Sequence, residues 1–377
     1  MQILITILVF LILFSIIIMF HELGHFLAAR ASGVLVEEFG WGFPPKIWGK
    51  KIGKTTYTIN ALPIGGFVRL YGSEFEKPND PKAFWNQSIA KRLLVLSAGV
   101  VFNILLAAIF YYFILVTHNF VSQPIFLFNE YKFPFGQTQV YSTLITNVAV
   151  SSPAANAGLL PGDLVTAVNS HAVTTSVELN NAVAGKQGKS QVLTVKNISL
   201  GTTRTVNATP YYDSQYQKTR FGLELGEVAY ASYNTPLEKA ASGFLQTANI
   251  GAYTVKTLVD LVSVSVKTKS FAPVSENLTG PIGIAQIVGI VVQTSGPQLI
   301  WNLLEIGALL SLALGITNIL PIPAMDGGHI AFVLFELITK RKPSRVIHEK
   351  VTQYGFYALI ALSILIAAKD IWRLLKQ

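Results

Sequence analysis

The sequence predicts a polytopic α-helical membrane protein with four transmembrane helices, a membrane-associated β-hairpin and an inserted extracytoplasmic domain of mixed α and β structure. Three observations predict this fold class. Hydrophobic residues make up 51% of the 377 residues and charged residues only 13%, whereas soluble domains carry about 25% charged residues. Four apolar segments have the length of a membrane span. Between the second and the third, the chain is more polar and includes the alternating pattern of strands.

The predicted organisation has eight parts, which follow one another along the chain. They are a first transmembrane helix (1–30), a cytoplasmic loop with the hairpin (31–92), a second transmembrane helix (93–117), an extracytoplasmic domain (138–226), extracytoplasmic amphipathic helices (227–298), a third transmembrane helix (299–330), a basic cytoplasmic loop (340–350) and a fourth transmembrane helix (352–377).

Lysine and arginine set the predicted orientation. Residues 30–92 contain ten of them and residues 340–350 contain five, whereas the much longer segment 118–298 contains eleven. The positive-inside rule therefore places the first two regions in the cytoplasm and segment 118–298 outside. Within 227–298 we expect surface helices and no further span, because lysines and a Gly-Pro pair interrupt the apolar pattern.

The first apolar segment ends in a His-Glu-Leu-Gly-His motif at residues 21–25. His21 and His25 lie four residues apart and so share one helix face, where both can bind a single metal ion. Glu22 lies beside them and can polarise a metal-bound water. The pattern also recurs by chance on surface helices, but apolar residues on both sides argue against that alternative. The run is longer than a signal-peptide core and lacks a basic start, so we expect it to be retained.

A third metal ligand is needed, because a catalytic zinc ion has three protein ligands and one open position. The chain has no Cys, which excludes disulfides, thiolate ligands and a Cys nucleophile. Asp326 follows the third apolar helix and two helix-breaking prolines, which places it at the depth of His21 and His25. The alternative for Asp326 is a helix-capping residue before Gly-Gly.

Residues 152–169 resemble a PDZ domain. A turn of small residues precedes Gly-Leu-x-x-Gly-Asp and an alternating strand that ends in Asn169. Strand-like segments at 191–195 and 204–208 and a helix-like segment at 177–184 complete the predicted domain. PDZ domains bind the end of an extended chain by strand addition. The alternative is a spacer of the same shape that binds no peptide.

With these motifs in this order, nearly the whole chain resembles the site-2 protease family of intramembrane zinc metalloproteases. The nearest resemblance is to its bacterial regulated-intramembrane-proteolysis branch with a single PDZ domain, and Asn318-x-x-Pro-x-Pro-x-x-Asp326-Gly is part of it. The resemblance implies one Zn2+ per chain, with three ligands and a catalytic base. The implied ligands are His21, His25 and Asp326, and the implied base is Glu22.

Two further stretches carry this resemblance. Residues 62–67 match the family's Pro-x-Gly-Gly stretch, which lies in a membrane-dipping hairpin and corresponds here to about 47–70. Residues 99–103 resemble its Gly-Pro-x-x-Asn motif, with Val100 in place of the proline, and Met325 replaces the usual leucine before the aspartate. The resemblance implies that the unwound substrate is bound by four residues, Gly65, Gly66, Asn103 and Asn318. The alternative for each asparagine is an interhelical hydrogen bond that only packs the bundle.

The remaining histidines are expected to bind no metal. His329 lies three residues after Asp326 and can share its helix face, but a fourth protein ligand would close the site. We therefore expect it to pack beside the ligands. We expect His118, His171 and His348 to be solvated.

The resemblance implies an intramembrane zinc metalloendopeptidase that cleaves within the transmembrane segments of single-span proteins, after a prior extracytoplasmic cut. Anti-sigma factors and remnant signal peptides are examples of such substrates. It also implies a multi-pass protein of the bacterial cell membrane, with the PDZ domain outside and the active site toward the cytoplasm. Its partners are the substrate and the lipid bilayer, and no nucleic acid, because topology explains the basic residues.

Two other classes of function remain as alternatives. One is a non-catalytic PDZ-bearing receptor or chaperone on a protease scaffold, against which the intact motif argues. The other is a metal-ion transporter, which would need neither Glu22 nor a PDZ domain and usually shows an internal repeat. Replacing Glu22 with Gln distinguishes the enzyme from both alternatives. In an enzyme this change should abolish cleavage and leave metal binding nearly intact, whereas neither alternative gives Glu22 such a selective role.

Overall fold

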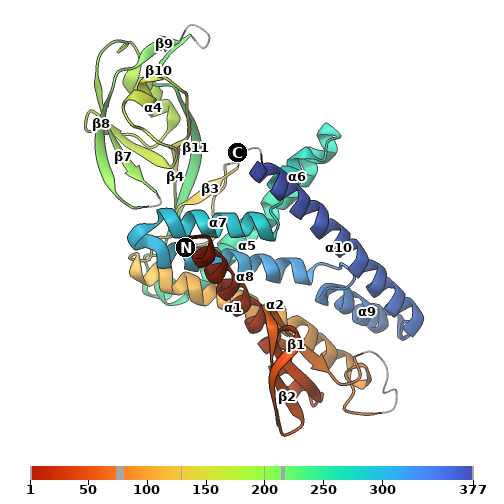
Figure 1. Cartoon of the computed structure of the whole chain (residues 1–377). Coiled ribbons are helices and arrows are strands. Elements are labelled where there is room, and N and C mark those ends of the chain that lie inside the picture. Colours follow the sequence, from red (N-terminus) through yellow and green to blue (C-terminus); the bar gives the residue numbers. More distant parts are fainter. Residues whose placement is uncertain (1, 74–79, 129, 199, 214–216, 376–377) are drawn as a thin grey trace. The chain divides into compact units, whose positions relative to one another are not determined.

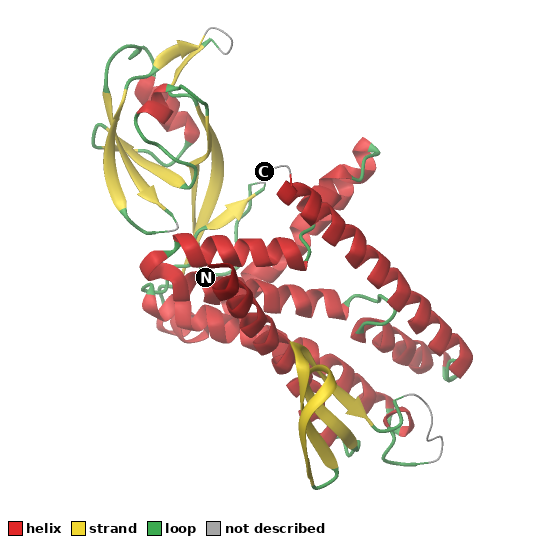
Figure 2. Ribbon diagram, viewed as in Figure 1, coloured by secondary structure: helices red, strands yellow, loops and turns green. Residues whose placement is uncertain are grey.

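The computed structural model describes residues 2–73, 80–128, 130–198, 200–213 and 217–375 (Figure 1). The chain divides into two compact units. Unit 1 comprises Met1–Tyr111, Leu258–Thr294 and Leu303–Gln377, and unit 2 comprises Tyr112–Thr257 and Ser295–Asn302. Unit 1 is mainly helical and contains one β-hairpin, whereas unit 2 is rich in strands (Figure 2).

Long apolar helices provide the predicted spans. They are α1 (Gln2–Ala31), α2 (Ile89–Thr117), α8 (Leu299–Ile319) and α10 (Arg345–Leu375). Among the described residues, four helical segments are long and apolar enough to cross a membrane, and they lie on these helices. The fold thus fits a membrane protein with an additional β-rich region.

The third predicted span, 299–330, is interrupted. Helix α8 ends at Ile319, and α9 (Asp326–Thr339) begins after a short irregular segment. Pro321 and Pro323 lack the backbone N–H that would continue the helix. Gly327 allows α9 to pack against this break, because a Cβ at that position would collide with the carbonyl oxygens of Leu320 and Ile319. Two helices therefore occupy the region predicted as one.

The basic segment 340–350 is only partly a loop, which corrects the prediction for its second half. Helix α10 already begins at Arg345, so its first turns carry Arg345 and Lys350, whereas the other three basic residues of this segment precede it. Arg345 and Glu349 form an i,i+4 ion pair, which stabilises a helix. Charged residues of this kind therefore fit the start of a helix as well as a solvated loop. Hydropathy therefore marks where the apolar part of α10 begins but misses its first turns.

The predicted hairpin is larger than 47–70. It consists of β1 (Val36–Ile52) and β2 (Thr55–Leu70), and the 3-10 helix η1 (Phe84–Asn86) follows it. In the register, Phe39 of β1 pairs with both Tyr57 and Val68 of β2. The first part of β1 therefore lies between two segments of β2, and the 66–70 segment pairs with β1 on one side. Ser15 of α1 donates a hydrogen bond to the Pro63 carbonyl at 2.9 Å, which fixes the hairpin against the first helix.

Unit 2 is built on a sheet in the order β3-β11-β4-β5-β7-β8, with β6 paired to β5. Its strands are β3 (Ile125–Leu127), β4 (Gln137–Val148), β5 (Asp163–Val168), β6 (His171–Ala172), β7 (Gln191–Asn197), β8 (Thr203–Ala208) and β11 (Leu223–Ser232). A separate pair consists of β9 (Tyr211–Asp213) and β10 (Lys218–Arg220). The short helices are α3 (Pro153–Asn156), α4 (Ser176–Val183) and the 3-10 helix η2 (Gly296–Gln298).

The strands and the helix predicted within the PDZ-like region lie on β7, β8 and α4, but the sheet extends beyond 138–226. Strand β3 precedes this interval, and β11 continues to Ser232. The apolar core includes Leu159, Val165 and Leu193. It lies between the sheet strands and the helices, as expected for a domain whose strands and helices each have one apolar face.

The segment predicted as surface helices, 227–298, begins with the end of β11 and then forms three helices. They are α5 (Pro236–Thr268), α6 (Ala272–Asn277) and α7 (Pro281–Thr294). The start of α7 is tied to the end of α10, because Asp370 Oδ2 accepts hydrogen bonds from the N–H groups of Gly280 and Gly283, each at 3.0 Å. A side chain ninety residues away thus satisfies N–H groups at this helix start.

Candidate metal centre

Helix α1 places His21 and His25 one turn apart, in the interior of unit 1. Their side chains are 8% and 9% exposed, and their Nε2 atoms lie 3.1 Å apart. The helix is unbroken here because the apolar run contains no proline. Gly24, between them, allows close packing on α2, since a Cβ there would lie 2.5 Å from the Ala98 carbonyl oxygen.

Asp326, the first residue of α9, completes the group. Its Oδ2 lies 3.2 Å from His21 Nε2 and 3.3 Å from His25 Nε2. One donor atom from each residue falls within 4.8 Å of the others. The helix cap is Met325, whose side chain makes no capping bond. The carboxylate of Asp326 therefore faces the two imidazoles and does not cap α9.

The donor set fits a zinc ion. Ligand atoms of a tetrahedral zinc with bonds of about 2.0–2.1 Å lie roughly 3.3 Å apart, close to the distances found here. Asp326 Oδ2 is buried and accepts no well-formed hydrogen bond from the residues that the structure describes. Gly99 of α2 leaves the space open, because a Cβ there would lie 2.7 Å from His21 Nε2 and would collide with His25 Nε2. Two imidazoles and a carboxylate are also ligands that zinc prefers.

Backbone and side-chain groups of α2 orient the two imidazoles. His25 Nδ1 lies 2.8 Å from the Val95 carbonyl oxygen, so Nδ1 carries the proton and Nε2 faces the site as an acceptor. His21 Nδ1 lies 3.1 Å from the side-chain amide of Asn103. Both contacts leave Nε2 as the atom that can bind a metal.

The amide of Asn103 has two possible orientations. With Nδ2 toward His21, the buried Oδ1 has no hydrogen-bond partner among the described residues. Oxygen and nitrogen of an amide are assigned from the hydrogen-bond network and can be exchanged. The exchanged orientation lets Oδ1 accept from His21 Nδ1–H, which matches the tautomer that metal binding at Nε2 requires. Asn103 is fully buried beside the ligand, and the substrate contact implied for it stays a prediction.

Glu22 lies next to the ligands at a small cavity of about 260 Å³, which His21, His25 and Asp326 also line. The backbone of Val68 in β2 lies near its carboxylate. Val68 and Leu70 line the same cavity. The hairpin therefore forms one wall of the candidate site.

The other predicted substrate-binding residues occupy two places. Asn318, near the end of α8, is half-buried with its amide 3.5 Å from His21 Nε2. Gly65 and Gly66 pack against α1, where a Cβ on Gly66 would lie 2.5 Å from Met19 Sδ. Gly65 has φ of +88°, a conformation that glycine adopts without strain. Asn318 thus borders the metal site and the two glycines position the hairpin, while their role in substrate binding stays a prediction.

The prediction for His348 is wrong. Its side chain is buried, and its Nε2 lies 3.2 Å from His329 Nδ1, while its ring packs 4.9 Å from that of Trp85. His348 looked solvated because it lies among basic residues, but it occupies the first turns of α10 on the face packed against α9. His329 lines the cavity of the candidate site, beside the ligands, and lies outside the three-residue ligand group.

The other two histidines differ in exposure. His171 is exposed as predicted, whereas His118 is half-buried at the end of α2, 2.8 Å from the Ile114 carbonyl oxygen.

A buried ion pair near the site was not predicted. Arg92 at the start of α2 donates to Glu336 of α9 at 2.9 Å, and the two side chains are 3% and 12% exposed. The Arg92 guanidinium also lies 5.5 Å from the ring centroid of Trp85. These contacts connect the helix that orients the imidazoles to the helix that carries Asp326. The sequence signal for this ion pair was Arg92 itself, a charged residue at the start of an apolar helix.

The chain is similar to known proteins along nearly its whole length. A sequence model of Peptidase family M50 matches residues 9–362. A protein of Clostridium acetobutylicum named "Putative zinc metalloprotease" is 30% identical over 366 residues, covering 97% of each chain. Proteins of the same name from Nostoc sp. and Clostridium perfringens are 32% and 29% identical and cover 96% of this chain and 95% and 97% of their own. The chain therefore belongs to Peptidase family M50, the site-2 protease family.

Proposed function

We propose that this chain is an intramembrane zinc metalloendopeptidase that hydrolyses peptide bonds within transmembrane segments of single-span membrane proteins. The observation that carries the proposal is the group of His21, His25 and Asp326 with Glu22 beside it, because the two histidines and Glu22 lie on an apolar helix long enough to span a bilayer. Ionisable groups at membrane depth are costly and usually serve a function. The curated relatives named above are consistent with this chemistry.

The proposed ligands hold one zinc ion per chain. When bound, zinc polarises the scissile carbonyl and makes a water molecule more acidic. Glu22 accepts the proton from the attacking water and returns it to the leaving amine. The Val68 backbone lies near the Glu22 carboxylate and would limit its movement during this proton transfer. The Val95 carbonyl and Asn103 keep the imidazoles in the tautomer that presents Nε2.

The hairpin offers a place for an unwound substrate. A helical peptide bond is shielded by its own hydrogen bonds, and in lipid each freed backbone group costs several kcal/mol unless it finds a new partner. The 66–70 segment of β2 pairs with β1 on one side and lines the cavity through Val68 and Leu70. A substrate strand added at this edge would regain its backbone hydrogen bonds beside Glu22.

In this proposal, the basic residues of 30–92 and 340–350 lie in the cytoplasm of a bacterial cell, with the active site toward that side. Unit 2 lies outside the cell as a PDZ-like domain. It admits substrates that a prior cut has already shortened, by binding the new chain end or by limiting access. Anti-sigma factors and remnant signal peptides are single-span proteins of this kind.

The test is cleavage of a tagged single-span model substrate that lacks its outer domain, by the purified full chain in detergent. We expect cleavage within the span by the wild type, and loss of cleavage in Glu22→Gln or after zinc chelation. Glu130→Gln is the matched control, because Glu130 is an exposed carboxylate of unit 2. Bound zinc without any cleavage would favour the non-catalytic receptor or chaperone, and absence of bound zinc would overturn the proposal.

A further inference from the structure

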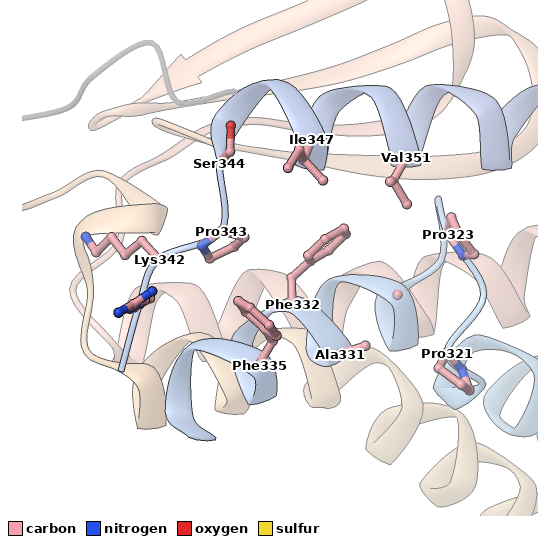
Figure 3. Close-up of a pocket in the computed structure, with 12 residues that line it drawn as sticks. Pro321, Pro323, Ala331, Phe332, Phe335, Lys342, Pro343, Ser344, Ile347 and Val351 are labelled. Atoms are coloured by element: carbon pink, nitrogen blue, oxygen red, sulfur yellow. The ribbon is translucent and has the colours of Figure 1, made fainter. Parts of the chain in front are cut away.

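A second cavity lies in unit 1 between α9 and α10 and has no part in the proposed reaction. Its volume is about 530 Å³, within the range of ligand pockets. Figure 3 shows Phe332 and Phe335 of α9 on one side and Ile347 and Val351 of α10 on the other. Lys342, Pro343 and Ser344, from the connection between the helices, lie at one end.

The body of this cavity is apolar and open. Phe335 and Ile347 are 49% and 57% exposed, although both are large apolar side chains. Apolar surface of this kind favours an apolar occupant over water. An occupant of the cavity must therefore have an apolar part, which excludes a small inorganic anion as the full ligand.

The mouth of the cavity is cationic. Arg341 and Lys342 line it, together with the exposed Ser344. Neither side chain has an ion-pair partner within the part of the chain that the structure describes. The nearest acidic residues in sequence are already engaged, because Glu336 pairs with Arg92 and Glu349 pairs with Arg345. The mouth thus presents two uncompensated positive charges.

We propose that this cavity binds one anionic phospholipid. The phosphate would lie at Arg341 and Lys342, with Ser344 as an additional hydroxyl donor, and an acyl chain would lie along Phe332 and Val351. Basic pockets between transmembrane helices are known to select anionic headgroups. Both requirements, an anion and a long apolar tail, are met by a lipid of the surrounding membrane.

The position of the cavity connects the lipid to the candidate metal site. Pro321, Pro323 and Gly328 also line it; the two prolines lie in the helix break before Asp326, and Gly328 lies in the first turn of α9, which carries Asp326. A bound lipid would therefore fill the space behind this break and stabilise it. The proposal depends on a membrane location but is independent of peptidase activity, so either can fail without the other.

The experiment is native mass spectrometry of the purified full chain, delipidated in detergent and then titrated with phosphatidylglycerol or with phosphatidylcholine of the same acyl chains. We expect one phosphatidylglycerol to be retained in preference to phosphatidylcholine. Each cation near an anionic group contributes about a fivefold change in affinity, so Arg341→Ala with Lys342→Ala should weaken retention roughly 30-fold. Ala331→Trp, which fills the apolar part, should weaken retention of both lipids.

The matched control is Lys50→Ala with Lys51→Ala, which removes two exposed cations of β1 that do not line the cavity. This control should retain phosphatidylglycerol as the wild type does. Equal retention of the two lipids, or unchanged retention in the Arg341 and Lys342 variant, would overturn the proposal. Displacement of the lipid by glycerol phosphate alone would show that the apolar part is not used. Displacement by a single-span substrate peptide would identify the occupant as polypeptide.

Discussion

Asp326 in unit 1 and Asp163 in unit 2 both follow short motifs rich in glycine or proline, but their surroundings differ. Asp163 is fully buried and satisfied, since it accepts hydrogen bonds from Arg204 at 2.6 Å and from the Leu160 N–H at 3.1 Å. Asp326 Oδ2 instead faces two imidazole nitrogens without a well-formed hydrogen bond from the described residues. The number of hydrogen-bond donors around the carboxylate distinguishes one that stabilises a turn from one that can bind a cation.

The largest expected effect is at Asp326. Asp326→Ala should remove a metal ligand and lower cleavage by roughly 10³-fold, because the Lewis acid contributes several kcal/mol to the transition state. The chain should stay folded, because no hydrogen bond of the turn depends on this carboxylate. Zinc content measured by atomic emission, together with cleavage of the model substrate, tests this. An Asp326→Ala variant that retains zinc in full would contradict the assignment.

At Asp163 the expected change is in stability, with zinc content unaffected. Removing one partner of a fully buried pair costs about 3–5 kcal/mol, and less here because the Arg204 side chain is 39% exposed. Asp163→Ala should therefore destabilise unit 2 by about 2 kcal/mol. Hydrogen exchange of the full chain should show faster exchange across β5, β7 and β8. Faster exchange around α1 to the same extent would show that the effect is not local.

The third prediction concerns the orientation of His21. If Asn103 Oδ1 accepts from His21 Nδ1–H, then Asn103→Leu should lower zinc affinity by about 10–100-fold, as the loss of such supporting hydrogen bonds does in other metal sites. Asn103→Asp keeps an acceptor at this position and should retain most of the affinity. Competition with a fluorescent zinc chelator measures both variants. Equal losses of zinc affinity in the two variants would indicate that Asn103 only packs the helices together. Its backbone carbonyl accepts a hydrogen bond from the Ser311 hydroxyl.

The sequence predicted the residues of the candidate metal site, which the fold brings together, because the two histidines are four residues apart on a helix and Asp326 follows a proline break. It did not predict the Val95 carbonyl or the nearby Val68 backbone, because backbone groups have no side-chain signature and reach the site only through tertiary packing. His348 was misplaced for a related reason. Its neighbours in sequence are charged, whereas its neighbours in space are His329 and aromatic rings.

The extent of the hairpin was underestimated because β1 is interrupted by glycines and by Pro44-Pro45, which weaken the strand pattern. The helices were predicted more fully, since a continuous apolar run identifies a span without knowledge of its partners. Local patterns thus predict elements and contiguous motifs, while long-range partners such as Arg92 and Glu336 become visible only in the folded chain.

The smallest effect is expected at a third kind of carboxylate, the exposed Glu178 at the start of α4. Its side chain accepts hydrogen bonds from the N–H groups of Thr174 and Thr175, and these lower its pKa below the usual value of 4.5. Thr175 in turn accepts from the Glu178 N–H, which completes a capping box. A carboxylate whose pKa is lower in the folded chain stabilises the fold above the unfolded pKa and loses that contribution as pH falls through the folded value.

Amide protection of α4 should therefore decline as pH falls below 4.5 in the wild type, after correction for the intrinsic exchange rate. Glu178→Gln should remove this pH dependence while leaving zinc content unchanged. Glu238 is an internal control in the same molecule, because it forms the same box with Thr235 at the start of α5 and its pKa is also lowered. The α5 start should keep its own pH dependence in the Glu178 variant. Loss of both together would mean that protonation of Glu178 affects unit 2 as a whole and not its own helix start alone.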